Sequence, residues 1–326
     1  MEKRIQVESG TPYKIDIPVL LIFFCRADKF GKVFEQVKAA RPSKLYLYQD
    51  GARTEADREG IQKCREIAEQ VDWCCDIHMW YQESNIGCDP SGFMAQRWMF
   101  LQEEMGIVLE DDVVPSQSFF LFCKELLEKY KEDERIHIIC GMNNTGVSEH
   151  VQDSYLFTSK GSVWGWASWK RVAMLWDENY SWLESEQVLR NLKGQRLNKR
   201  EYKKYLQYAI AHKKSDKAYH ETIGGMDLYL YNRLNIVPKY NMITNIGIGE
   251  ETTHSAVDIK FLPKRIQKLF YMKRYEIDFP LKHPQYMMPD YIFEKQMEMP
   301  TLVRVWADRF EVALRRIYYG LIRRGV

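Results

Sequence analysis

The sequence predicts an α/β fold in which a mostly parallel sheet is flanked by helices, and three observations favour this class. Short β-forming runs alternate with helical patterns through the first 150 residues, which is the order of parallel strands joined by crossover helices. The run over residues 18–24 is apolar throughout, as a central parallel strand must be on both faces. The chain has 326 residues, 45% of them apolar and 28% charged, so it can bury a large core and is close to the globular average.

The expected elements follow one another in a regular order. Runs of β-forming residues predict strands over 18–24, 44–48, 73–81, 107–109 and 136–140. Apolar residues at helical spacing predict helices around 30–37, 61–71, 93–100 and 119–130. Pro42 is expected to end the first helix, Asp89 followed by Pro90 to begin the third, and Gly106 to end it.

Beyond residue 150 the pattern changes to aromatic-rich segments, with five tryptophans between residues 164 and 182. We expect this part to face a substrate rather than to form a second wound sheet, and residues 185–220 to be a charged helical stretch. The sequence is therefore divided into residues 1–150, residues 151–260 and an extension over residues 261–326.

The end of this extension predicts an amphipathic helix within residues 300–326. One side of this helix carries an apolar stripe, and several arginines lie elsewhere around the helical wheel. The stripe consists of Val303, Trp306, Phe310, Leu314, Ile317 and Leu321. Such a helix either lies in an anionic membrane surface or docks on the rest of the chain.

Charge and cysteine content exclude some classes of partner. Lys and Arg total 47 against 45 acids, a formal charge of +2, which is too balanced for a nucleic-acid coat. The seven cysteines are odd in number, irregularly spaced and mostly inside apolar runs, which indicates a reduced, cytoplasmic protein. No stretch approaches the roughly 18 to 20 apolar residues that a transmembrane helix needs. We therefore expect neither a nucleic-acid partner nor a membrane span.

Three consecutive carboxylates close the strand over 107–109, and this is the sharpest motif in the chain. Strand alternation sends Glu110 and Asp112 to one face and Asp111 to the other, at the edge where open parallel sheets bind ligands. Acids crowded in this way repel one another, and a hard cation such as Mn²⁺ or Mg²⁺ would relieve the repulsion and bind a diphosphate. The alternative is an acidic strand exit with ordinary solvation.

Other phosphate-binding and hydrolytic motifs are absent from the sequence. There is no GxxxxGK[ST] motif, no GxGxxG after the first strand and no HExxH. P-loop nucleotide hydrolysis and dinucleotide binding therefore lack their usual sequence motifs.

Several motifs together resemble the nucleotide-sugar glycosyltransferases of the GT-A fold. The resemblance is to the N-acetylglucosaminyltransferase I type, whose acidic motif reads Glu-Asp-Asp, and to its bacterial relatives, and it covers roughly residues 17–256. The segments that carry it are Gln96-Arg-Trp98, Val108-Leu-Glu-Asp-Asp-Val-Val-Pro115, Cys140-Gly-Met-Asn-Asn-Thr-Gly146, Gly161-Ser-Val-Trp-Gly-Trp166, Gly225-Met-Asp227 and Asn245-Ile-Gly-Ile-Gly-Glu-Glu-Thr-Thr-His254.

The resemblance implies a set of donor-binding residues. Asp111 corresponds to the ribose contact and Glu110 to a group hydrogen-bonded to donor-sugar hydroxyls. Arg26, just past the first strand, would meet the nucleotide or diphosphate, and Asp50 after the second strand would accept from the uracil N–H.

The resemblance also implies the metal ligands and the general base. Asp112 corresponds to the direct protein ligand of the metal, and His254 to a residue against the diphosphate or metal. Asp227 matches the general base of inverting members, although the flanking tryptophan and second acid of the family are missing here, and Asp177 is the rival base. Trp166 is expected to contact a sugar or the acceptor, because indole rings stack on sugar faces.

The resulting hypothesis is a metal-dependent, inverting glycosyltransferase of the hexosyltransferase class. It would move a sugar from a UDP-sugar to a glycan or glycolipid acceptor in bacterial cell-surface polysaccharide synthesis. Residues 1–260 would form the GT-A catalytic domain, with a nucleotide-sugar half (1–150) and an acceptor half (151–260), and residues 300–326 would hold the enzyme on the inner face of the plasma membrane.

Two other classes of function stay open. A sugar-phosphate nucleotidyltransferase shares the sheet and the metal chemistry, but it needs a glycine-rich basic loop after the first strand, which residues 26–30 do not supply. A non-catalytic sugar-binding protein could retain the same fold, since fold alone does not establish activity.

Overall fold

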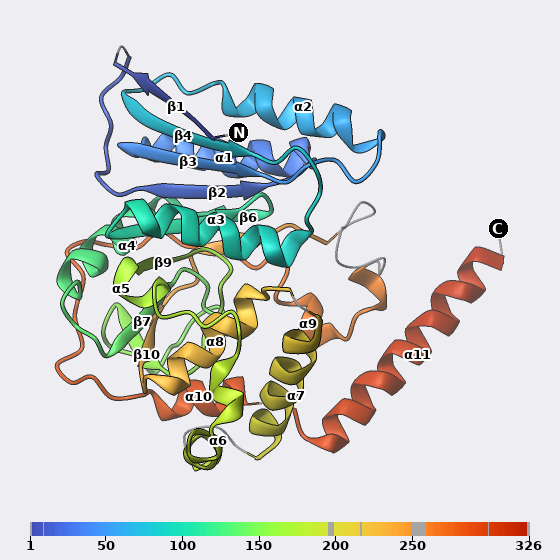
Figure 1. The fold of residues 1–326 in the computed structure, drawn as a ribbon. Helices are drawn as coiled ribbons and strands as arrows, with labels where there is room; N and C mark the ends of the chain where they lie inside the picture. Colours follow the sequence, from blue (N-terminus) through green and yellow to red (C-terminus); the bar gives the residue numbers. More distant parts are fainter. Residues whose placement is uncertain are drawn as a thin grey trace.

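The computed structural model describes residues 2–8, 10–194, 199–215, 217–248, 259–298 and 300–324, and it has the α/β architecture that the sequence predicts (Figure 1). One large sheet runs through the molecule in the order β1-β4-β3-β2-β5-β9-β7-β10-β8. The strands β2, β3, β4, β5, β7 and β10 point the same way, while β1, β8 and β9 run against them. The strands are β1 (Glu2–Val7), β2 (Val19–Phe23), β3 (Lys44–Gln49), β4 (Cys75–Tyr81), β5 (Met105–Glu110), β7 (Ile136–Cys140), β8 (Tyr155–Thr158), β9 (Trp166–Trp169) and β10 (Leu234–Pro238), and β6 (Val113–Pro115) pairs with β11 (Ile243–Asn245) in a small second sheet.

Helices cover both faces of the large sheet. One face carries α1 (Ala27–Ala40), α2 (Asp57–Ala68) and α4 (Gln117–Lys129). The other carries α3 (Cys88–Gln102) and α8 (His220–Leu230), with α6 (Glu186–Lys193), α7 (Lys199–Ser215) and α10 (Tyr291–Met297) outside them. The shorter elements and the last helix are α5 (Lys170–Ala173), η1 (Ser181–Glu184), η2 (Ile259–Phe261), α9 (Lys264–Gln267) and α11 (Leu302–Arg324).

Strand β2 shows why the sheet needs helices on both sides. Its residues Leu21 and Phe23 pack into the core under α1 and α4, whereas Leu20, which precedes them, packs into the core under α3. All three are buried, as the uninterrupted apolar run predicts for a central parallel strand.

The five predicted strands and the four predicted helices of the first half are confirmed, with two corrections. Gly106 does not end a helix but lies inside β5, because α3 has already ended at Gln102. Strand β1, which pairs antiparallel with β4 at the edge of the sheet, was not expected from the sequence.

The second half forms no second wound sheet within the described residues, but it adds strands to the large sheet, which the sequence did not indicate. Strands β8, β9 and β10 all join the large sheet, and β9 lies between β5 and β7. The ranges 1–150 and 151–260 therefore share one sheet, and their proposed functional separation stays a prediction.

Helix α11 extends away from the body of the molecule (Figure 1). Polar contacts join it to the body: Arg265 Nε donates to Asp308 at 2.6 Å, and the Lys264 N–H donates to Glu311 at 3.1 Å. No helix within the described residues is long and apolar enough to cross a bilayer.

Candidate active site

The carboxyl ends of β2 and β5 bring a guanidinium against the three predicted acids. The two strands pair in parallel with Ile22 opposite Glu110, so the residues that follow each strand lie side by side. The main chain after β2 turns directly into α1, with Arg26 at its N-cap position, and the chain after β5 turns at Asp111 and Asp112. We call Glu110, Asp111 and Asp112 the acidic turn, and this side of the sheet the carboxyl edge.

Arg26 is the cation of this cluster. Its Nη2 donates to Asp111 in a short ion pair and to Asp112 Oδ2 at 2.8 Å, and the Phe24 N–H donates to Asp111 Oδ2 at 3.3 Å. The side chains of Arg26 and Asp112 are each 13% exposed. Burial acts to lower the pKa of Arg26, but the charges and hydrogen bonds of the two aspartates outweigh it and raise that pKa.

Glu110 has a raised pKa, and burial also raises the pKa of Asp111. Burial, together with the negative charges of Asp112, Glu221 and Asp111, raises the pKa of Glu110 to about 8. A carboxyl group of this kind retains its proton near neutral pH and can donate as well as accept a hydrogen bond. The three acids therefore do not all carry a charge at once unless a further cation joins Arg26.

The residues present fit a hard cation at Asp112. Its Oδ2 accepts from Arg26, but its Oδ1 is buried and has no hydrogen-bond partner. Carboxylate oxygen is the donor type that Mn²⁺ and Mg²⁺ prefer. Within the described ranges no group of three or more His, Cys, Asp or Glu side chains forms a complete metal cage, so the remaining ligands would come from a bound phosphate or from elsewhere in the chain.

The segment before predicted His254 passes directly over this carboxylate. Ile246 donates its N–H to the Asp112 carbonyl at 2.8 Å, and a Cβ on Gly247 would collide with the Asp112 carboxylate. Glycine at this position therefore lets the main chain approach the candidate ligand. His254 itself lies outside the described residues, so its role stays a prediction.

Asp50 is buried at the end of β3 and accepts four hydrogen bonds. The donors are the N–H groups of Gly51, Ile86 and Gly87, at 2.9, 3.0 and 3.0 Å, and the side-chain amide of Asn85 at 2.8 Å. These bonds use the acceptor capacity of a carboxylate and fix the loop before α3. A contact with uracil, as predicted, needs one of these bonds to be released.

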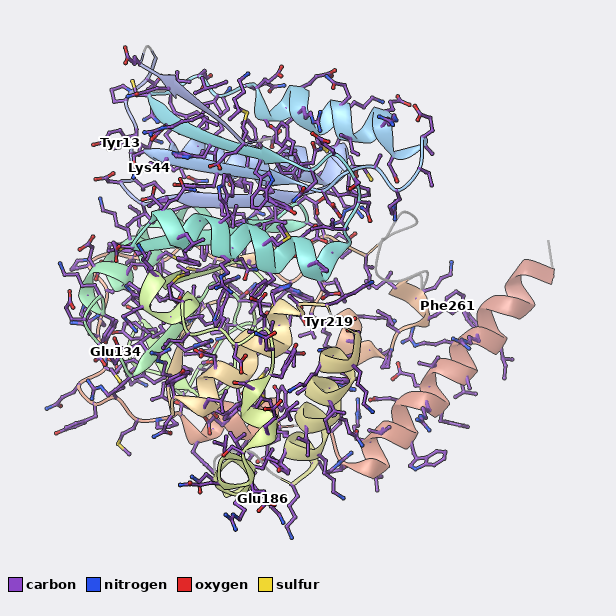
Figure 2. The ribbon with its side chains drawn as sticks, viewed as in Figure 1. Tyr13, Lys44, Glu134, Glu186, Tyr219 and Phe261 are labelled. Atoms are coloured by element: carbon purple, nitrogen blue, oxygen red, sulfur yellow. The ribbon has the colours of Figure 1, made fainter. Side chains whose placement is uncertain are left out.

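Asp227 lies on α8 away from the acidic turn. It is 2% exposed, with Arg233 Nη1 at 3.2 Å and His137 Nδ1 at 3.4 Å from its Oδ2. Arg233 also bonds Glu134, which precedes β7 and therefore belongs to the amino edge of the sheet. In Figure 2 Glu134 lies at the left edge of the molecule, whereas Tyr219, the residue before α8, lies well to its right, near the middle.

The rival base, Asp177, holds a local turn. Its carboxylate accepts from the N–H groups of Asn179 and Ser181, at 3.1 and 2.6 Å, and from the Ser181 hydroxyl at 2.7 Å. The structure thus engages both predicted bases in internal contacts, and the choice between them stays open.

A cavity of about 550 Å³ opens between the sheet, α7 and α8, and the sequence did not predict the cavity itself. Trp166 forms part of its wall, where it also packs near Trp176 and Phe100. Glu221, in the first turn of α8, lines the same cavity. Two features of the sequence point to this region: the aromatic-rich segment that was expected to face a substrate, and the pair Gly224-Gly225 inside a helical stretch, which is unusual because glycine disfavours helix interiors.

Comparison with known proteins finds similarity to solved structures alone. No family model matches the chain, and no curated protein matches it. Of 71 matching chains among the solved structures, one is the glycosyltransferase GlyE of Streptococcus pneumoniae TIGR4, with 9% sequence identity and a TM-score of 0.34. The match covers 91% of this chain and 64% of that structure, so the chain spans less than two thirds of its length.

Proposed function

We propose that the chain is a metal-dependent glycosyltransferase that takes its sugar from a UDP-sugar. The observation that carries this proposal is the cluster at the carboxyl edge, where Arg26 pairs with Asp111 and Asp112 and one buried oxygen of Asp112 has no partner. Ligands of open α/β sheets bind at this edge, and an arginine beside a cation site suits a diphosphate.

Each member of the cluster has a distinct role in this proposal. Asp112 would hold Mn²⁺ or Mg²⁺ through its unpartnered Oδ1, and the cation when bound would neutralise charge on the departing nucleoside diphosphate. Arg26 would exchange part of its contact with the aspartates for the diphosphate oxygens. Glu110, protonated near neutral pH, would donate to or accept from hydroxyls of the donor sugar.

The transfer itself needs a base for the acceptor. In an inverting reaction the acceptor oxygen attacks the anomeric carbon, its proton passes to a carboxylate, and the bond from that carbon to the diphosphate oxygen breaks. Asp227 and Asp177 are the bases predicted by resemblance, and a further candidate is argued below.

The loop after β2 favours this reading over the nucleotidyltransferase alternative. The chain passes from Cys25 and Arg26 straight into α1, leaving no room for a glycine-rich loop around a triphosphate. A nucleotidyltransferase would release pyrophosphate from a nucleoside triphosphate, and a sugar-binding protein would release no nucleotide. Product analysis therefore separates all three functions.

Calorimetric titration of UDP against other nucleoside diphosphates tests the donor site, with Mn²⁺ present and then chelated. We expect binding that is selective for UDP, needs the metal and is lost in Asp112→Ala. Asp278→Ala, which changes an exposed aspartate, is the matched control and should bind as the wild type does. If no nucleoside diphosphate binds in the presence of metal, the glycosyltransferase proposal fails.

We further propose that α11 binds an anionic membrane surface, because it presents its apolar side to solvent. Trp306 and Phe310 are each 66% exposed and Ile317 is 60% exposed, whereas Asp308 and Glu311 on the opposite side of the helix contact the body. A helix docked for its own stability would orient these faces the other way.

The charges of α11 complement an anionic lipid surface. Arg309 and Arg316, seven residues apart, border the apolar stripe, and neither pairs with an acid among the described residues. Each basic residue near such a surface contributes about 1 kcal/mol to binding. The expected position of the helix is therefore in the interface, with Trp306 and Phe310 inserted.

Flotation with vesicles tests this surface. We expect the full chain to float with phosphatidylglycerol-containing vesicles but not with pure phosphatidylcholine, and both a chain ending at residue 298 and the Trp306→Glu/Phe310→Glu variant to stay behind. Lys295→Glu, which lies outside α11, is the control variant. Arg304→Glu is unsuitable as a control because Arg304 pairs with Asp308. Equal flotation of all forms, or concentration-dependent dimers without flotation, would discard the proposal.

A further inference from the structure

Two adjacent glycines leave open space over the middle of α8. A Cβ added at Gly224 would have the Trp176 indole nitrogen at 4.0 Å as its nearest neighbour, and one at Gly225 would have Tyr205 Cε1 at 4.0 Å. Packing therefore does not require glycine at either position, although glycine is costly inside a helix. The space that they leave is part of the cavity of about 550 Å³, a size typical of ligand pockets.

Buried polar atoms without partners line this cavity. Trp176 is 7% exposed and its indole N–H has no acceptor, and Asn235 is 6% exposed and its Oδ1 has no donor. Such atoms are rarely left unpaired in a folded protein, because they lose their bonds to water on burial. They offer one donor and one acceptor to a hydroxylated ligand.

The remaining lining is aromatic and close to neutral in charge. Lys160 and Glu201 pair at 2.8 Å within the wall, and the other charged lining residues are Lys204 and Glu221. Tryptophan and tyrosine rings line the cavity together with these polar groups. This composition suits the C–H faces and hydroxyls of a neutral sugar better than a carboxylated or phosphorylated ligand.

The cavity reaches the carboxyl edge at Glu221. Trp166 in its wall pairs across β9 and β5 with Val108, two residues before Glu110. Glu221 is exposed in the first turn of α8, where it makes no hydrogen bond with a described residue, and its charge acts on Glu110. A carboxylate that is free of internal partners thus stands between the acidic turn and the cavity.

We propose that the cavity binds a neutral saccharide acceptor and that Glu221 is the general base toward its hydroxyl. The acceptor oxygen bonds to the anomeric carbon of the donor, its proton passes to a Glu221 carboxylate oxygen, and the nucleoside diphosphate leaves with the electrons of the broken carbon–oxygen bond. This inference rests on the proposed function of the carboxyl edge.

Asp227 is less well placed for this role than Glu221. Six residues of helix separate the two, about 9 Å along the axis, and Asp227 lies at the end of α8 that faces Glu134 and the amino edge. Its contacts with Arg233 and His137 favour a structural part in holding α8 on β7.

Binding of simple glycosides tests the cavity directly. We expect tryptophan fluorescence or saturation-transfer NMR to detect at least one of a panel of methyl glucosides, galactosides, mannosides and N-acetylglucosaminides. Gly225→Leu, which fills the space, should weaken that binding at least tenfold, and Trp176→Phe should weaken it too. Gly31→Ala on α1 is the matched helix-glycine control. No binding by the wild type, or unchanged binding by Gly225→Leu, would overturn the inference.

Glycoside-dependent release of UDP from UDP-sugars tests the base. We expect Glu221→Gln to lower kcat by roughly 10²- to 10⁴-fold and to leave metal-dependent UDP affinity no weaker. Glu186→Gln, an exposed glutamate on α6, should behave as wild type. If Asp227→Asn rather than Glu221→Gln has this pattern, or if the wild type releases no glycoside-dependent UDP, the assignment is wrong.

The two proposals fail in different ways. If the proposed function is wrong, the wild type will bind no nucleoside diphosphate in the presence of metal. Failure of this inference alone shows as intact UDP binding together with a cavity that ignores glycosides or a Glu221→Gln variant of full activity.

Discussion

Arg26 serves as the counter-charge that lets two aspartates lie buried at the end of one strand. Without it, Asp111 and Asp112 would face each other with only the Phe24 N–H and solvent to compensate them. Breaking a buried ion pair by removing one partner is strongly destabilising, because the other charge is left unpaired. The same pair of carboxylates is where a divalent cation would bind.

We therefore expect Arg26→Ala to lose about 3–5 kcal/mol of unfolding free energy in the presence of a chelator. Mn²⁺ should raise its melting temperature more than that of the wild type, because the cation takes over the missing charge. Differential scanning fluorimetry measures both. Arg4→Ala removes the exposed partner of Asp76 and should destabilise the chain far less. Equal Mn²⁺ shifts in wild type and Arg26→Ala would place the cation elsewhere.

The raised pKa of Glu110 predicts a loss of stability at alkaline pH. Its pKa is about 8 in the folded chain against an ordinary value of 4.5, so the folded state holds the proton more tightly. The resulting stabilisation is complete below pH 4.5 and disappears as the pH rises through 8. In chelator, the unfolding free energy of wild type relative to Glu110→Gln should therefore fall between pH 5 and 9. A difference that stays constant with pH would show that Glu110 is ionised throughout.

Some site residues follow from sequence order alone, and others depend on contacts that sequence order does not specify. Arg26 and the acidic turn were predictable as neighbours, because each follows a parallel strand and such strands end at one edge. The hydrogen bonds of Asp50 come from a loop some 35 residues further on, and the pairing of Asp227 with Arg233 depends on how α8 packs against β7. Neither was visible in a local pattern.

At the scale of elements, replacing the glycines of α8 and of α2 by alanine should change the unfolding free energy in opposite directions. Gly224 and Gly225 have room for a Cβ, so alanine at either position should raise the unfolding free energy by about 0.5–1 kcal/mol. Gly60 in α2 lies against the Cys25 carbonyl, so a Cβ there would collide with main chain and Gly60→Ala should destabilise. Urea unfolding midpoints measure all three. A destabilising Gly224→Ala would mean that the space over α8 is filled in solution.

The elements that the sequence missed are those whose formation depends on distant partners. Strand β1 is mostly exposed and polar, and it forms by pairing with β4 some seventy residues later. In the sequence, strand β9 is part of a tryptophan-rich segment without a strand pattern of its own. In the structure its residues pair with β5 on one side and β7 on the other. Strand β5 was predictable because charged residues bound its apolar run on both sides, whereas β9 has charged residues only after it, at Lys170 and Arg171.

At the scale of the whole molecule, one sheet connects the candidate donor site to the cavity. Strand β5 carries the acidic turn, and β9 beside it carries Trp166 into the cavity wall. Because β9 is hydrogen-bonded on both sides, the two sites are held by a common rigid scaffold. Domain closure is therefore not required to bring a bound sugar and the acidic turn together.

Helix α11 stands apart from this scaffold, and its removal should leave the rest of the chain folded. None of its described side chains belongs to either hydrophobic core. It is joined to the body by partly exposed polar contacts, which are Arg265 with Asp308, Lys264 with Glu311, and Arg315 with the Lys260 carbonyl. Surface ion pairs of this kind contribute about 0–1 kcal/mol each. A chain ending at residue 298 should therefore melt within a few degrees of the full chain in the absence of lipid, and should bind UDP with the same metal dependence. A fall of 10 °C or more would show instead that the apolar stripe of α11 packs on the body in solution, which would also remove the surface proposed to meet the membrane.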